Sequence, residues 1–113
     1  MDQAEISTGG SVLLEGAEIS GDIRTGKDMF LDGVGQGDVE CKGKLVIGRN
    51  GVVEGNVVCR KLVLDGLIAG NAEVDEKTCL TADALIKGFL QTSCLLLHPE
   101  AVIEEGLRLK DNK

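Results

Sequence analysis

Four cysteines and one histidine are the side chains of this 113-residue chain best suited to metal binding or thiol chemistry. Cys41, Cys59, Cys79 and Cys94 lie 18, 20 and 15 residues apart without a C-x-x-C pair, and His98 is the single histidine. Structural zinc sites usually take their ligands in close pairs. The spacing therefore predicts buried, unliganded thiols and no metal site. Stacked positions of Cys41 and Cys59 leave a redox role as a hypothesis that the spacing does not settle.

Three other motifs resemble chemical sites only superficially. The stretch 33–38 reads Gly-Val-Gly-Gln-Gly-Asp, but no helical period follows it, as a dinucleotide loop requires. We interpret its glycines as turn glycines. The acidic pairs Asp75-Glu76 and Glu104-Glu105 are more typical of solvated turns than of general acid–base pairs, and the stretch 98–100 predicts an exposed turn. We therefore predict no catalytic residue and no cofactor, and we do not expect an enzyme.

The composition limits the class of protein that can carry these residues. Aromatic residues make up 2% of the chain, so the core must be built from Val, Ile, Leu and Ala. Sixteen glycines and a single proline argue against both a helix bundle and a disordered chain. The net charge of −7 argues against direct binding of nucleic acid or of an anionic membrane. The first residues carry no signal-peptide pattern, so we expect a cytoplasmic protein.

A repeat of about 17 residues organises the sequence. The phrase apolar-x-Gly-(Asp/Asn)-apolar occurs at 19–23, 53–57 and 68–72, with weaker copies between and after them. Its central positions are 21, 37, 55, 70, 88 and 105, spaced by 16, 18, 15, 18 and 17. Four residues before each centre stands a small residue, the anchor of that repeat. The anchors are Ala17, Gly33, Gly51, Gly66, Ala84 and Ala101.

Aligned on the anchors, the repeats separate into apolar and polar columns that alternate with period two, which indicates half-buried strands. The column two after the anchor contains Ile19, Gly35, Val53, Ile68, Ile86 and Ile103. The column six after it contains Ile23, Val39, Val57, Ala72, Leu90 and Leu107. A second apolar run precedes each following anchor, at 29–31, 45–47, 62–64, 78–80 and 95–97.

A 17-residue circuit cannot bury its own apolar face, but stacked circuits can. We therefore predict an all-β fold, a single-stranded right-handed parallel β-helix of about six rungs, over residues 11–109. Residues 1–10 and 110–113 are expected to be tails, the first of them flexible. The glycine column is either a sharp bend or a place with no room for a side chain. The apolar column one after the anchor is either an exposed stripe or, as we favour, a corner turned inward.

The ends of such a solenoid expose unpaired strand edges unless something caps them. Apolar positions run from Val12 to Leu109, and neither end carries an amphipathic helix. Open edges let another copy continue the stack. The residues that we predict at this contact are Val12, Leu14, Ile19, Ile23, Ile103, Leu107 and Leu109. The alternative is a non-polymerising β-helical module that presents an acidic face to a partner protein.

The runs 45–48, 52–57, 61–70 and 100–104 resemble the bactofilins, bacterial polymer-forming cytoskeletal proteins, and the resemblance covers about residues 11–109. It implies filaments that are non-polar, form without nucleotide, and scaffold cell-shape or cell-envelope machinery. The implied partners are the protein itself and peptidoglycan-remodelling or membrane adaptor proteins at the inner face of the membrane. Two features depart from the family pattern. Residues 1–10 are acidic and polar instead of membrane-targeting, and Phe89 lies one circuit before the terminal one.

Overall fold

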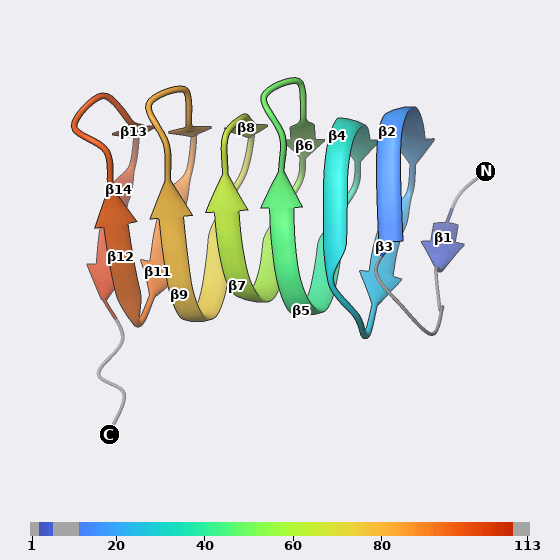
Figure 1. Cartoon of the computed structure of the whole chain (residues 1–113), viewed down its shortest axis with the longest axis horizontal. Helices are drawn as coiled ribbons and strands as arrows, with labels where there is room; N and C mark the ends of the chain where they lie inside the picture. Colours follow the sequence, from blue (N-terminus) through green and yellow to red (C-terminus); the bar gives the residue numbers. More distant parts are fainter. Residues whose placement is uncertain (1–2, 6–11, 110–113) are drawn as a thin grey trace.

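The chain forms a right-handed parallel β-solenoid (Figure 1). The structure is a computed structural model that describes residues 3–5 and 12–109. In these residues every strand belongs to one continuous parallel sheet, and no helix interrupts it. The all-β fold class predicted from the repeat is therefore confirmed.

Three faces make up the coil, and several strands bend around a corner from one face to the next. Face A contains the first part of β2 (Val12–Ser20) and of β4 (Met29–Gln36), the last part of β5 (Val39–Ile47), β7 (Val57–Leu64) and β9 (Ala72–Leu80), and β12 (Cys94–Leu97). Face B contains the last part of β2 and β4, then β6 (Val52–Glu54), β8 (Leu67–Ile68), β10 (Leu85–Ile86) and β13 (Val102–Ile103). Face C contains β1 (Gln3–Glu5), β3 (Asp22–Thr25), the first part of β5, β7 and β9, then β11 (Phe89–Thr92) and β14 (Gly106–Leu109).

The strand register reproduces the columns read from the sequence. On face B the paired residues are Ile19, Gly35, Val53, Ile68, Ile86 and Ile103, in that order. Six stacked strands enclose five turns of the coil, so the expected six rungs correspond to about five turns. On face C the column six after the anchor pairs in the same way, from Ile23 to Leu107.

Aliphatic side chains fill the interior. Leu31, Leu45, Ile47, Val53 and Leu64 are completely buried, and other columns supply further Val, Ile and Leu. Both phenylalanines stay outside the core, with Phe30 half-buried and Phe89 37% exposed. The expectation of a core without aromatic rings is therefore confirmed for the described residues.

The corner between faces B and C explains the glycine column. A Cβ atom added to Gly37, Gly55 or Gly70 would overlap the carbonyl oxygen of the glycine one rung before it. Gly21 and Gly37 also have positive φ values of 111° and 145°, where glycine is favoured. The crowding therefore comes from the neighbouring rung and not from an opposite wall of the coil. Close stacking of successive corners excludes side chains there.

A ladder of side-chain hydrogen bonds runs along the same corner. Asp22 Oδ1 accepts the backbone N–H of Asp38 at 3.0 Å, and Asp38 Oδ1 accepts that of Asn56 at 3.0 Å. Asn56 and Asn71 continue the pattern, so Asn71 Oδ1 accepts the N–H of Phe89. Because one Asx side chain satisfies a corner N–H in the next rung, the recurring Gly-Asp/Asn pair holds successive rungs together.

Removal of one ladder side chain should have a moderate cost. Asn56→Ala leaves the backbone N–H of Asn71 without its acceptor at 3.1 Å. We expect a loss of about 1 kcal/mol in the free energy of unfolding, the usual net value of one hydrogen bond. Urea denaturation followed by circular dichroism measures it. Asn50→Ala is the matched control, since the Asn50 side chain makes no hydrogen bond within the described residues. Equal stability losses in the two variants would contradict a stabilising ladder.

One expectation about the corners is wrong. The apolar column one after the anchor does not turn inward but lies on the outer side of face B. Val34, Val52, Leu67 and Leu85 are half-buried there, and Val102 is 47% exposed. The next residue in each strand occupies the inward position, so parity along the strand decides the direction.

Candidate functional site: the two ends of the solenoid

At the C-terminal end of the coil, the last strand of each face is an edge strand. Its last strands are β12 on face A, β13 on face B and β14 on face C (Figure 1). Within the described part of the chain each has a neighbour on one side only: β9, β10 and β11. The backbone N–H and C=O groups along the outer edge of these strands are therefore available to another strand.

Inward-facing side chains of this last rung are exposed because no further rung covers them. Leu107 is 44% exposed, whereas Leu90, its partner in the preceding rung, is fully buried. Leu97 is 49% exposed against 2% for its partner Leu80. Leu109 is the most exposed of the three at 59%. In each of these three columns, the residues of the preceding rungs are buried because another rung follows them. The exposure of the last residue therefore results from its position and not from its type.

Three of the residues predicted at the contact lie together here: Ile103, Leu107 and Leu109. The predicted set does not include Leu95, Leu97 and the outward-facing Leu96, which belong to the same last rung through β12. Their signal was present in the repeat, because the run 95–97 is the last copy of the second apolar run. The alignment assigned the run 95–97 to the repeat that begins at Ala84. In the structure this run forms β12, the face A strand of the last rung.

The N-terminal end differs from the C-terminal end. Strand β1 pairs in parallel with β3 and covers the outer edge of face C. Ile23 lies beneath it and is 1% exposed, so this residue belongs to the core and not to an exposed surface. Ile19 is half-buried on face B. Val12 and Leu14 lie in β2, and their side chains are outside the described residues.

The segment 1–10, expected to be a flexible tail, thus contributes one short strand at Gln3–Glu5. The rest of this segment and residues 110–113 lie outside the described residues. Flexibility of the N-terminal tail stays a prediction.

The glycine column and the Asx ladder of the corner between faces B and C both end before the last rung. Glu105 occupies the position that glycine holds at 88, and Gly106 occupies the Asx position after Phe89. Phe89 has no side-chain oxygen to accept the N–H of Gly106. The Asx ladder therefore ends at Phe89, one rung before the terminal one, where the sequence placed this residue.

The potentially reactive side chains outside the two ends have structural roles. Cys41 and Cys59 stack in adjacent rungs of face C, and the Cys41 thiol donates to the Lys27 carbonyl oxygen at 3.2 Å. Burial raises the pKa of both thiols. His98 Nδ1 accepts the N–H of Glu100 at 3.1 Å in an exposed turn, as predicted.

The stretch 33–38 corrects one interpretation. Gly33 and Gly35 lie inside β4, so only Gly37 stands at a turn.

In the described residues no group of three His, Cys, Asp or Glu side chains is placed to hold a metal ion. No helix of the described chain has the length and apolar character needed to cross a bilayer.

The burial of two cysteines predicts graded thiol reactivity. Since the thiolate is the reactive species, burial and a raised pKa should protect Cys41 and Cys59 in the folded chain. Exposed Cys94 should react first with a chromogenic disulfide reagent, half-buried Cys79 more slowly, and the other two only after unfolding. Mass spectrometry of the labelled peptides identifies the sites. Equal labelling of all four thiols in the native protein would contradict this order.

Comparison with known families identifies the family of this chain. The sequence model of the bactofilin family, described as polymer-forming cytoskeletal, matches residues 11–107. The chain belongs to the bactofilin family. The matched segment runs from the start of β2 into β14, so the solenoid carries the features shared by bactofilins. A search of curated proteins and a search of solved structures found no match.

Proposed function

We propose that this bactofilin assembles end to end, without nucleotide, into non-polar filaments that scaffold cell-shape or cell-envelope machinery. The observation that carries the proposal is the open C-terminal rung, where Leu97, Leu107 and Leu109 are 44–59% exposed beside a strand edge that pairs with no other described strand. Membership of a polymer-forming cytoskeletal family supports it.

Energetically, the open rung favours a contact between copies. Full burial of one leucine contributes about 1.5–3 kcal/mol. Half of each of three leucines is still exposed, so covering them would contribute roughly 3–4 kcal/mol. Each backbone hydrogen bond across the strand edge adds about 1 kcal/mol. Together these terms act against the loss of translational and rotational freedom that association costs.

Like ends meeting like ends fit this molecule better than a head-to-tail stack. In a head-to-tail stack β1 would block face C, because it already occupies the outer edge of β3. The Asx ladder could not continue either, since Gly106 offers no side-chain oxygen to a following rung. Contacts that alternate between C-terminal pairs and N-terminal pairs bring no C-terminal rung against β1, require no continuation of the ladder, and give a filament without polarity.

Partners follow from charge and family. The net charge of −7 disfavours direct contact with anionic lipid, so we propose a cytoplasmic scaffold that reaches the membrane through an adaptor protein. Peptidoglycan-remodelling proteins are the proposed clients. Nucleotide independence is supported by the position of stretch 33–38 in a strand and a corner of the solenoid, where no helix follows to bind a phosphate.

Electron microscopy and sedimentation of the purified full-length protein, without nucleotide, test the proposal. We expect long filaments that pellet at high speed. A stable monomer under all conditions would overturn it and would favour the non-polymerising module with an acidic face.

A further inference from the structure

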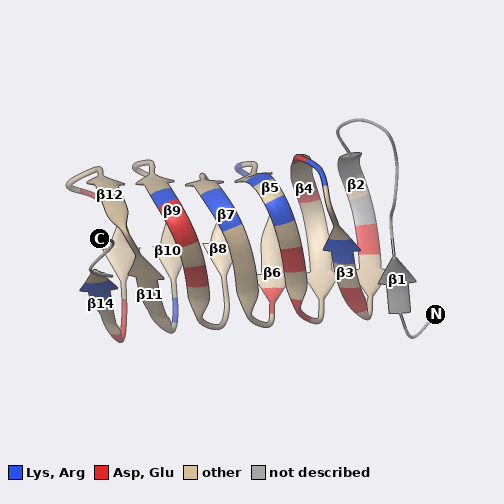
Figure 2. Cartoon of the chain, turned by 90° about the horizontal axis from the view of Figure 1, so that it is seen from below, with Lys and Arg blue, Asp and Glu red and all other residues tan. Residues whose placement is uncertain are grey.

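The two ends of the solenoid differ on face C, and the difference comes from β1. Figure 2 shows β12 and β14 at one end of the coil, with no described strand beyond them. At the other end β1 lies beyond β3, with Ala4 beside Ile23 (Figure 1). Ile23 is 1% exposed, whereas Leu107 in the same column at the uncovered end is 44% exposed. β1 therefore acts as a cover for the first rung.

The cover extends over one of the three faces. On faces A and B the outermost described strand at this end is β2, so face C extends one strand further than the other two. Adjacent strands lie about 4.8 Å apart. A second copy that pairs along the edges of faces A and B would meet β1 where its own strand should pair with β3. The N-terminal end is therefore uneven while β1 is in place.

The pairing of β1 is short. It extends over three residues, whereas β5 and β7 pair over seven. Ala4 stands at the register position that Ile23 and Val39 occupy in the following rungs, and alanine has less apolar area than isoleucine or valine. Short segments with few contacts open locally at a low free-energy cost. β1 can therefore leave the sheet while the rungs beneath it stay folded.

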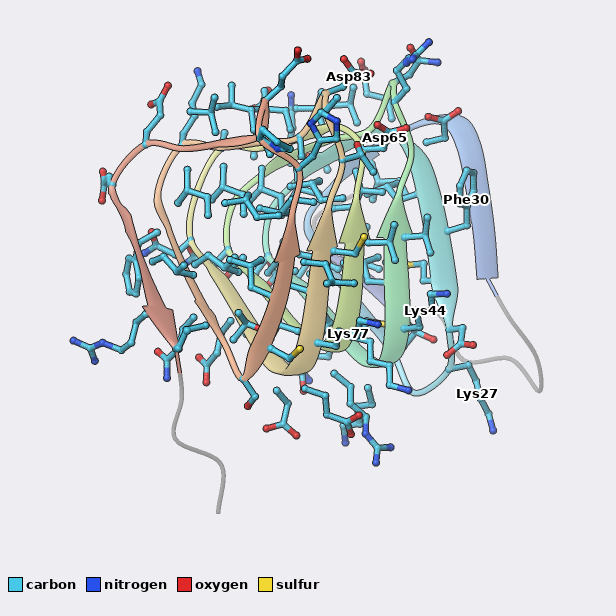
Figure 3. All side chains as sticks on the ribbon, turned by 60° about the vertical axis from the view of Figure 1, so that its left-hand side comes forward. Lys27, Phe30, Lys44, Asp65, Lys77 and Asp83 are labelled. Carbon is cyan, nitrogen blue, oxygen red and sulfur yellow. The ribbon has the colours of Figure 1, made fainter. Side chains whose placement is uncertain are left out.

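The connection from β1 to β2 is longer than the corner of the next rung. In register, Glu5 corresponds to Arg24 and Val12 to Met29. Six residues lie between the first members of these pairs in the chain, and four lie between the second members. Figure 3 shows Lys27 extending into solvent from the shorter corner. β1 therefore has a longer connection than a regular rung needs and can leave β3 without displacing β2.

We propose that β1 is an autoinhibitory strand that closes the N-terminal end of the solenoid against a second copy. While β1 pairs with β3, copies join through their C-terminal rungs and stop at dimers. When β1 leaves, the outer edge of β3 becomes available beside that of β2, and two N-terminal ends can pair. The inference rests on the proposed end-to-end assembly and assigns the control of one of its two contacts to β1.

The equilibrium between docked and released β1 sets the strength of the N-terminal contact. Both copies must release β1, so the apparent dissociation constant is inversely proportional to the square of the open fraction. An open fraction of about one third already weakens the contact about tenfold. A change that displaces β1 should therefore promote assembly, and a change that strengthens its pairing should oppose assembly.

Two substitutions at Ala4 test the proposal with opposite expected signs. In the next rung the backbone N–H at this register position, that of Ile23, donates to the Asp38 carbonyl oxygen at 2.9 Å, and proline has no N–H. Ala4→Pro should therefore release β1. Ala4→Val introduces a residue that favours strands and should hold β1 in place.

The matched control and the background isolate the N-terminal contact. Ala82→Pro makes the same chemical change in a corner where Pro99 already occupies the corresponding position one rung later. All variants also carry Leu107→Arg, because a buried arginine without a partner should block the C-terminal contact. Analytical ultracentrifugation then measures N-terminal dimers alone, and thermal unfolding verifies that each coil is intact.

We expect the dissociation constant of these dimers to fall about tenfold or more in Ala4→Pro, to stay unchanged in Ala82→Pro and to rise in Ala4→Val. Deletion of residues 1–10 should act as Ala4→Pro does. Equal dissociation constants in Ala4→Pro and Ala82→Pro, or weaker dimers after the deletion, would overturn the autoinhibitory role and leave end-to-end assembly intact. Absence of dimers from every variant would overturn both this role and the N-terminal pairs of the proposed filament.

Discussion

Leu107→Arg is expected to abolish filaments while the solenoid stays folded. Leu107 lies in the last strand of face C and is 44% exposed, so an arginine there can extend into solvent in the single subunit. Across the proposed contact the guanidinium would be buried without a partner, which costs several kcal/mol. That cost is comparable with the roughly 3–4 kcal/mol that the leucines of the open rung contribute, and the substitution also removes the share of Leu107 itself. Analytical ultracentrifugation should show no species larger than a dimer joined through the N-terminal ends.

Val58→Arg is the matched control for this variant. Val58 is 46% exposed on face C in the middle of the coil, between Glu40 and Glu73 on the neighbouring strands. It has the same exposure and receives the same change, but it lies away from the ends, so filaments should persist. Leu109→Arg at the same end provides a second variant. Normal filaments in both end variants would show that the C-terminal rung is not the contact.

Gly55→Ala should be strongly destabilising for a substitution that adds a single methyl group. The added Cβ would overlap the carbonyl oxygen of Gly37, which belongs to the backbone of the preceding rung and cannot rotate away. Relief requires the two rungs to separate at a corner that also carries the Asx ladder. We expect a loss of about 1–3 kcal/mol in the free energy of unfolding, as for overpacked interiors.

Gly26→Ala makes the same chemical change in open space, because an added Cβ there meets no atom within 4 Å. Its free energy of unfolding should stay within about 0.5 kcal/mol of the native value. Urea denaturation of both variants gives the comparison. If Gly55→Ala proved as stable as Gly26→Ala, corner stacking would not be the reason for the glycine column.

The sequence repeat predicted most of the fold because each column of the alignment has its own physical requirement. Stacked rungs need the same small residue at the crowded corner and the same aliphatic side chains inside, so one alignment on the anchors predicted the strand register. The placement of Val53 beside Gly35 and Ile68 follows directly from it. The apolar character of the column that contains Leu67 did not show whether its side chains lie on the inner or the outer side of face B. Half-buried outer positions also accept apolar residues.

The ends were harder to predict, because end residues keep the pattern of the interior. The repeat places Ile23 in the first rung, where an uncovered edge is expected, but β1 covers it through a pairing that lies outside the repeat. Leu97 has the chemistry of a buried residue, but it is exposed since no rung follows. Only the position of a rung in the stack distinguishes these cases. The sequence pattern alone does not give that position.

Hydrogen–deuterium exchange of β14 in the assembled and the dispersed protein is the most direct test of the end contact. If copies complete one another at the C-terminal rung, those amides of Gly106–Leu109 that face away from β11 should exchange rapidly in Leu107→Arg and slowly in filaments of the native chain. Amides of the buried central strand β7 should exchange slowly in both. Rapid exchange of β14 within intact filaments would contradict the account, because the last strand would then have no partner in the assembly.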